Sequence, residues 1–171
     1  MLDLKSKITQ IKDWPKKGAI YTDISDIFLD AQSFKYVIKE LAEFYKNKKI
    51  DYVAGIEARG FMVSSALAYE LGVGAIMIRK KAKQPPPIIF QEYTYEYSSS
   101  IVVMRKDALK QGQRIVLVDD ILATGCTMEA SISLIKRLKA EVVGISFVVE
   151  KEDLKGRDKF KKYKINSVVK I

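Results

Sequence analysis

The chain has 171 residues, 48% of them apolar, which suits one domain with a full hydrophobic core. It contains no histidine and one cysteine, which excludes Ser-His or Cys-His catalysis, a zinc site of the usual ligands and an internal disulfide. The formal net charge of +9 favours anionic ligands, and no nucleic-acid-reading motif, signal peptide or membrane-spanning run is visible, so we expect a cytoplasmic protein without nucleic-acid or membrane partners.

The N-terminal part predicts two helices separated by a turn. Residues 2–12 have a loosely helical apolar spacing, which indicates a short amphipathic helix packed on the body of the protein. Residues 13–18 contain Pro and Gly and form a turn. From Ser33 to Lys48 the apolar residues recur on one helical face, and Ser33 or Asp30 is the candidate first residue of this helix.

A buried strand is expected over residues 51–56, directly before Glu57-Ala58-Arg59-Gly60-Phe61 and a helix to Leu71. Gly60 lets the backbone approach a ligand closely, and Arg59 offers a planar set of donors that suits phosphate oxygens. The alternative is an ordinary strand-to-helix turn with a surface arginine.

The next strand is expected over residues 75–78, and a basic stretch over residues 79–85 follows it. Such a cationic cluster at a strand end can bind phosphate groups, and the alternative is a solvated basic loop. Residues 85–100 then form a long connection with three prolines at its start. A loop of this length in a compact domain is usually a functional lid or disordered.

The most informative stretch runs from Ile115 to Thr127. Four apolar residues, Ile115 to Val118, predict a strand buried on both faces of a parallel sheet. Asp119 and Asp120 follow at its carboxyl end, where their oxygens suit sugar hydroxyls or a hydrated cation. Small and hydroxyl residues come next, before a helix with apolar residues from Met128 onward. The free N–H groups at its start form a candidate site for a phosphate monoester.

The remaining segments complete an alternation of strands and helices. We expect a strand over residues 101–104, a short helical turn over 105–112, a long strand over 141–149 and an edge strand over 165–171. This alternation predicts an α/β fold with a parallel sheet and helices on both faces.

These motifs together resemble the type I phosphoribosyltransferases, which use phosphoribosyl pyrophosphate (PRPP). Residues 115–127 match the PRPP signature, residues 57–61 the pyrophosphate loop and residues 92–98 the lid motif. The last two point to the adenine branch of the family more than to the hypoxanthine or orotate branches. The resemblance implies one domain, 1–171, with a parallel-sheet core flanked by helices, a small N-terminal hood over about 13–30 and a flexible lid over about 81–100.

The resemblance also implies an activity and its residues. The reaction would transfer the phosphoribosyl group of PRPP to adenine, giving AMP and pyrophosphate in purine salvage, with Mg²⁺ held mainly by PRPP itself and with a homodimer as the assembly. The residues carried over are, for catalysis, Glu96, Asp119, Asp120 and Arg59; for the 5′-phosphate, Ala123, Thr124, Gly125, Cys126 and Thr127; for pyrophosphate, Arg59, Arg79, Lys80, Lys83 and Tyr97; and for the base, Ile20 and Tyr21.

Seven positions depart from the family pattern, among them Ala82 and Gln84 in the basic stretch and Tyr95 in the lid motif. Tyr21 stands for Phe and Thr22 for the Arg that helps to frame adenine, while Cys126 and Ser98 stand for Gly. The change at Thr22 leaves open transfer to another purine base. A non-catalytic regulator that binds PRPP or a nucleotide on the same fold is a separate alternative, because a fold does not fix a function.

Overall fold

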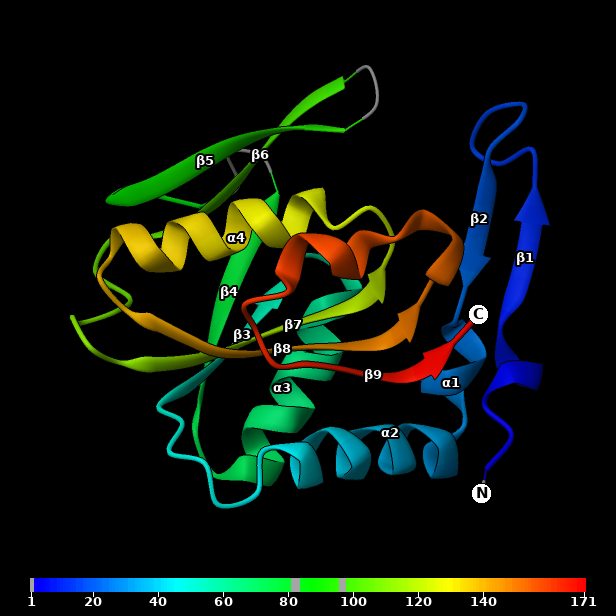
Figure 1. Cartoon of the computed structure of the whole chain (residues 1–171), viewed down its shortest axis with the longest axis horizontal. Helices are drawn as coiled ribbons and strands as arrows, with labels where there is room; N and C mark the ends of the chain where they lie inside the picture. Colours follow the sequence, from blue (N-terminus) through cyan, green and yellow to red (C-terminus); the bar gives the residue numbers. More distant parts are fainter. Residues whose placement is uncertain (1, 81–83, 96–97) are drawn as a thin grey trace.

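A seven-stranded sheet forms the centre of the computed structural model, which describes residues 2–80, 84–95 and 98–171 (Figure 1). Its strand order is β5-β6-β4-β3-β7-β8-β9, and the five strands from β4 to β9 are parallel to their neighbours within that set. The strand bounds are β3 (Tyr52–Ile56), β4 (Gly74–Lys80), β5 (Ile88–Tyr95), β6 (Ser98–Arg105), β7 (Arg114–Leu122), β8 (Glu141–Glu150) and β9 (Ile165–Lys170).

The sheet is covered on both faces, as the alternating pattern predicts. Helix α4 (Cys126–Arg137) lies over one face of the sheet, and α2 (Ala31–Phe44) and α3 (Arg59–Leu71) lie against the other (Figure 1). The short helix α1 (Ser25–Leu29) directly precedes α2 in the chain. The centre of β7 is fully buried and its side chains alternate between the two layers. Ile115 packs in the cluster beneath α4, whereas Val116 packs with α2 and α3. The prediction of a strand buried on both faces is therefore confirmed.

Helix α2 begins directly after a residue whose side chain caps it. Asp30 precedes α2, and its carboxylate accepts the backbone N–H of Ser33 at 3.2 Å, so the predicted cap is confirmed. The helix ends at Phe44 rather than at the predicted Lys48. Two short 3-10 helices, η2 (Glu152–Leu154) and η3 (Gly156–Phe160), connect β8 to β9.

The prediction of an amphipathic helix over residues 2–12 is wrong. The segment forms a 3-10 turn, η1 (Lys5–Lys7), and then β1 (Thr9–Lys12), which pairs antiparallel with β2 (Ile20–Asp23). All four side chains of β1 are exposed, so its apolar residues carry no core periodicity; Leu4 alone is buried. We call residues 9–23 the N-terminal hairpin; it stands apart from the sheet (Figure 1).

The prediction of a long loop over residues 85–100 is also wrong. Strands β5 and β6 pair antiparallel from Ile88 opposite Arg105 to Tyr95 opposite Ser98, and β6 continues the main sheet beside β4. The β-branched residues on both strands favour this pairing, and the prediction of a loop did not take them into account. Residues 81–83 and 96–97 of the predicted lid lie outside the described residues. Arg105 ends β6, and residues 106–112 form turns and irregular chain instead of the predicted helical turn. Arg105 pairs there with Asp107 at 2.6 Å.

The remaining structural predictions have simple outcomes. The strands expected over 51–56, 75–78, 101–104, 141–149 and 165–171 all form, and β9 lies at the edge of the sheet. Among the described residues, no helix combines the length and the apolar character needed to cross a membrane.

Candidate active site

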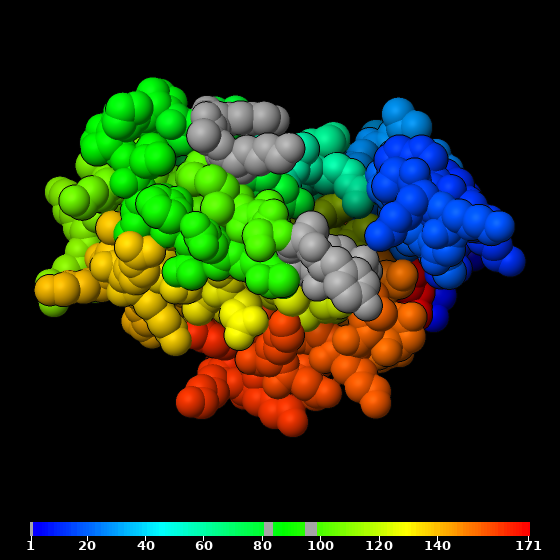
Figure 2. All heavy atoms as spheres, turned by 90° about the horizontal axis from the view of Figure 1, so that it is seen from above, coloured from blue at the N-terminus to red at the C-terminus, as the bar shows by residue number. Residues whose placement is uncertain are grey.

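A cavity of about 560 Å³ opens at the carboxyl ends of the parallel strands, next to the N-terminal hairpin. Figure 2 views the molecule from above, with the hairpin in blue on one side and β5 and β6 in green on the other. The cavity is lined by Ile20, Tyr21 and Thr22 of the hairpin; Arg59, Lys80, Tyr93 and Ser100; residues 119–128; and Phe147, Lys151 and Leu154. The carboxyl ends of parallel strands are the usual ligand sites of such sheets.

The two carboxylates of β7 differ in their surroundings. Asp119 accepts the backbone N–H of Asp120 on its Oδ1 at 2.9 Å, and burial together with the neighbouring Asp120 carboxylate raises the pKa of Asp119 above its usual value. Asp120 is buried and lies 2.5 Å from Arg59, Oδ2 to Nε. The pair therefore combines one charge-compensated carboxylate with one that holds its proton more tightly than usual.

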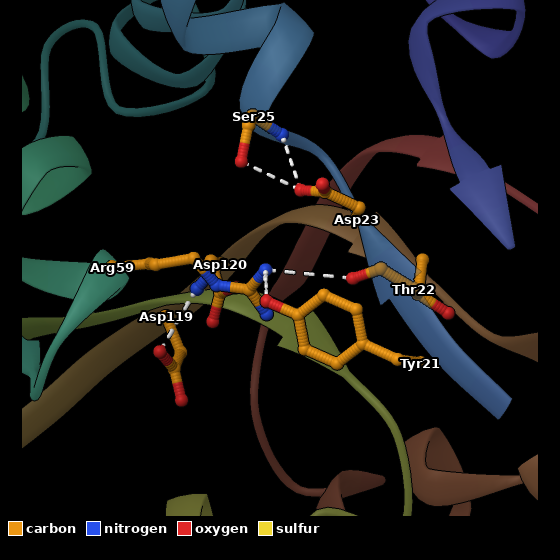
Figure 3. Close-up of polar contacts among 7 residues, drawn as sticks. All are labelled: Tyr21, Thr22, Asp23, Ser25, Arg59, Asp119 and Asp120. Atoms are coloured by element: carbon orange, nitrogen blue, oxygen red, sulfur yellow. Dashed lines mark hydrogen bonds and ion pairs between the residues drawn. The ribbon is translucent and has the colours of Figure 1, made fainter. Parts of the chain in front are cut away.

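Arg59 joins the sheet to the N-terminal hairpin (Figure 3). Besides its contact with Asp120, its Nη1 donates to the Tyr21 hydroxyl at 3.0 Å and to the Thr22 carbonyl oxygen at 3.4 Å. Its guanidinium lies over the Tyr21 ring, 5.3 Å from the centroid. The cation is thus held at the cavity wall by three elements, β2, α3 and β7.

The start of α3 leaves no room for a side chain at Gly60. A Cβ at this position would lie 2.7 Å from Oδ1 of Asp119 and 3.3 Å from the Val118 carbonyl oxygen. Glycine therefore lets the α3 N-terminus pack directly against the acidic pair. Nearby, the Lys80 backbone N–H donates to Glu57 at 2.8 Å, which ties the end of β4 to the loop before α3.

Residues 123–127, here called the 123–127 turn, lead into α4. Gly125 precedes the helix with φ +79°, a conformation that favours glycine, and α4 begins at Cys126. The first N–H groups of a helix lack intrahelical acceptors, and those of α4 border the cavity. η3 supports this turn from behind, because a Cβ at Gly156 would lie 2.0 Å from the Ala123 carbonyl oxygen. The turn is consequently packed tightly against η3, with its free N–H groups at the cavity, an arrangement that suits an anion.

Cys126 is half-buried at this helix start. Its Sγ lies 3.5 Å from the Thr124 hydroxyl and 3.1 Å from Nζ of Lys159, and these two contacts lower the pKa of the thiol. Lys159 also pairs with Glu129 at 3.4 Å. A side chain fits at this position where the family pattern has glycine.

The structure brings together most of the predicted site residues. Asp119, Asp120, Arg59 and Lys80, the base-pocket candidates Ile20 and Tyr21, and the 123–127 turn all line one cavity. Arg79 lies on β4, opposite Val103 of β6, and is not in the described lining. Lys83, Glu96 and Tyr97 lie outside the described residues.

Nine lining residues were not among the site residues predicted from sequence: Thr22, Tyr93, Ser100, Ile121, Leu122, Met128, Phe147, Lys151 and Leu154. Phe147 sits inside a long apolar strand and so resembles an ordinary core residue. Lys151 and Leu154 lie in the segment after β8, and their signal was the resemblance of residues 150–157 to the family segment beside the base.

The geometry that characterises this site is a turn at a helix N-terminus and an acidic pair at the end of a central parallel strand, faced by an arginine. A family model of the phosphoribosyl transferase domain matches residues 25–171, and the chain belongs to this family.

Within the family, the chain belongs with the adenine phosphoribosyltransferases. The enzyme of that name from Brachyspira hyodysenteriae is 43% identical over 168 residues, covering 98% of this chain and 99% of the relative, and that from Clostridium tetani is 46% identical, covering 98% of both. The crystal structure of the adenine phosphoribosyltransferase from Thermoanaerobacter pseudethanolicus is 42% identical, has a TM-score of 0.94, and covers 99% of this chain and 98% of that one.

Proposed function

We propose that this chain transfers the 5-phosphoribosyl group of PRPP to adenine and releases AMP and pyrophosphate, a step of purine salvage. The observation that supports it is the meeting, in one cavity, of the acidic pair, the 123–127 turn and Arg59. In this reaction the bond from C1 of the ribose to pyrophosphate breaks, and a purine ring nitrogen bonds to C1 with inversion and loses its proton.

The 123–127 turn binds the 5′-phosphate in this proposal. Backbone N–H groups at the α4 N-terminus donate to the phosphate oxygens, and the hydroxyls of Thr124 and Thr127 add to them. Binding this remote group fixes the position of C1 relative to the base.

Asp119 and Asp120 bind the ribose. Their oxygens accept hydrogen bonds from the sugar hydroxyls, and negative charge there stabilises the cationic character that develops at C1. Since Asp120 is already paired with Arg59, the ribose hydroxyls compete with that guanidinium for the carboxylate.

The leaving group is neutralised by cations around the cavity mouth. Arg59 and Lys80 line the cavity, and we assign them to pyrophosphate together with Arg79 and Lys83 and the Tyr97 hydroxyl. Mg²⁺ fits the donor set, since Asp119 and Asp120 supply hard oxygen atoms and PRPP supplies the remainder; when bound, the ion neutralises charge on the pyrophosphate. No group of three or more candidate metal-binding side chains exists in the described part of the chain, so in this proposal PRPP supplies most of the ligands.

The base binds between the N-terminal hairpin and β8. Ile20 and Tyr21 face this part of the cavity from the hairpin, and Phe147 and Leu154 face it from the sheet side, which gives aromatic and aliphatic surface for a planar ring. Glu96 is assigned to accept the purine proton.

The second candidate is transfer to another purine. It is favoured by one observation: Thr22 provides no charged donor to the cavity, where the family pattern has Arg, and instead its carbonyl accepts from Arg59.

We also propose a homodimer in the cytoplasm. Helix α3 carries Met62 and Tyr69 exposed, at 48% and 88%, and seven residues apart they share one helical face. Exposed apolar stripes of this kind commonly mark protein interfaces. The single cysteine is a free thiol, which suits a reducing compartment.

The test is pyrophosphate release from PRPP and Mg²⁺ with adenine, hypoxanthine, guanine or xanthine in turn. Release with adenine alone supports the proposal, and release only with an oxopurine supports the second candidate. PRPP binding without release for any base contradicts both and favours a regulator. Asp119→Asn with Asp120→Asn should lower turnover by at least about 100-fold, since two carboxylates at the reacting carbon are lost.

A further inference from the structure

The Tyr21 hydroxyl is a partner of Arg59 that the family pattern does not supply, because that pattern has Phe at this position. Figure 3 shows the phenol oxygen directed at the guanidinium, with Asp120 on the other side of the same group. The hydroxyl oxygen lies 3.0 Å from Nη1 and accepts its hydrogen bond. This contact joins residues 38 positions apart in the sequence.

The ring that carries this hydroxyl is itself held in place. Trp14 packs edge-on against Tyr21, with 4.6 Å between the ring centroids. Tyr21 also sits on β2, whose backbone is paired with β1 along four residues. The hydroxyl is therefore an acceptor at a fixed position in the cavity wall.

The two sides of the guanidinium meet different kinds of partner. On the sheet side Nε meets the Asp120 carboxylate at 2.5 Å. On the hairpin side Nη1 donates to two neutral acceptors among the described residues, the Tyr21 hydroxyl and the Thr22 carbonyl, while the Asp23 carboxylate attracts the cation electrostatically. The ribose of PRPP displaces the sheet-side contact in the proposed reaction, whereas nothing in that reaction displaces the hairpin-side contact.

We propose that Tyr21 is a positioning residue for Arg59. Its hydroxyl keeps the guanidinium at the cavity wall while Nε changes partner from Asp120 to the pyrophosphate of PRPP. This inference rests on the proposed function, specifically on the assignment of Arg59 to pyrophosphate. The N-terminal hairpin then has two roles in the proposed reaction: it lines the base pocket, and through Tyr21 it orients Arg59, which binds the pyrophosphate of PRPP.

The experiment is a double-mutant cycle of Tyr21→Phe and Arg59→Ala, with PRPP binding in Mg²⁺ measured by calorimetry and turnover measured as a function of each substrate. Tyr21→Phe removes one oxygen and keeps the ring. Tyr163→Phe is the matched control, since it removes a phenol oxygen from a partly buried ring that packs on the core away from the cavity lining.

We expect Tyr21→Phe to weaken PRPP binding about 5- to 10-fold and to raise the KM for PRPP similarly, because a hydrogen bond to a charged group is lost and water replaces part of it. The KM for adenine should change less than about 2-fold, and Tyr163→Phe should match the unaltered protein. In the Arg59→Ala background, Tyr21→Phe should have no further effect on PRPP binding.

Two results would overturn the inference alone. They are unchanged or tighter PRPP binding in Tyr21→Phe while Arg59→Ala weakens it, and an equal effect of Tyr21→Phe with and without Arg59. Unchanged PRPP binding in Arg59→Ala would instead remove the assignment of Arg59 to pyrophosphate, and the inference with it.

Discussion

Substitution of Gly60 by Ala tests whether the acidic pair depends on the close approach of α3. The added Cβ would lie 2.7 Å from Oδ1 of Asp119, whereas ordinary contact begins at 3.4 Å, so the carboxylate must move by about 0.7 Å. The β7 backbone also lies within 3.4 Å of this Cβ, which leaves the flexible carboxylate as the group that gives way.

A displacement of this size should act on the reaction more than on folding. A misplacement of about 1 Å at a reacting centre costs about 100-fold, so we expect kcat/KM for PRPP to fall about 10- to 100-fold. Overpacking of this kind costs about 1–3 kcal/mol of unfolding free energy, which for a chain of this size lowers Tm by roughly 2–12 °C.

The matched control is Gly72→Ala at the other end of α3. Gly72 has φ +67°, and a Cβ there would have no atom within 4 Å, so Ala strains the backbone by about 1 kcal/mol but touches nothing in the cavity. Steady-state kinetics and thermal unfolding of both variants provide the comparison. Equal loss of kcat/KM in the two variants, at equal folded fraction, would refute the argument that Gly60 acts through Asp119.

Three further predictions concern the surroundings of the site. Gly156→Ala places a Cβ 2.0 Å from a backbone carbonyl of the 123–127 turn, so AMP binding measured by calorimetry should weaken at least about 10-fold; unchanged affinity would show that this packing is dispensable. Arg157 lowers the pKa of the buried Glu150, so their pairing stabilises the fold above the usual glutamate pKa and is lost as pH falls through the lowered value. Glu150→Gln should therefore cost about 1–2 kcal/mol in urea unfolding at pH 7, allowing for the partly exposed Arg157, and the difference should shrink in acid; a constant difference would contradict the linkage. The rate at which iodoacetamide modifies Cys126 should rise with pH, with a pH midpoint below that of an ordinary thiol, and Lys159→Met should raise this pH midpoint. Equal pH midpoints in the Lys159→Met variant and the unaltered protein would exclude a role for the lysine.

The sheet and its helices could be predicted because their signals are local. Ile115 to Val118 form an uninterrupted apolar run, and both core clusters draw on alternate residues of that strand. The cap at Asp30 depends on a residue three positions away. In such segments burial and hydrogen bonding are decided within a few residues, so the pattern carries the information.

The hairpins escaped prediction because their partners are remote or exposed. In β1 all four side chains face solvent, so nothing in their hydropathy separates a strand from a helix. β6 is held by backbone pairing to β4, with Arg79 opposite Val103, which is a contact between residues far apart in the chain. Composition alone suggested a loop there, since three prolines precede β5 and three serines begin β6.

The candidate site also has parts with a local signal in the sequence and parts that depend on remote partners. The acidic pair and the 123–127 turn follow one another along the chain, so their function could be read as a motif. The proposed base pocket combines residues of β2, β8 and η2, and nothing in the sequence indicated that Phe147 lines the cavity. Arg59 shows both properties: its place in a loop motif marked it as a phosphate ligand, but its partners lie on β2 and β7. The orientation of this cation is therefore set by tertiary structure, and we expect a substitution in the hairpin to act through it on the proposed pyrophosphate end of the site.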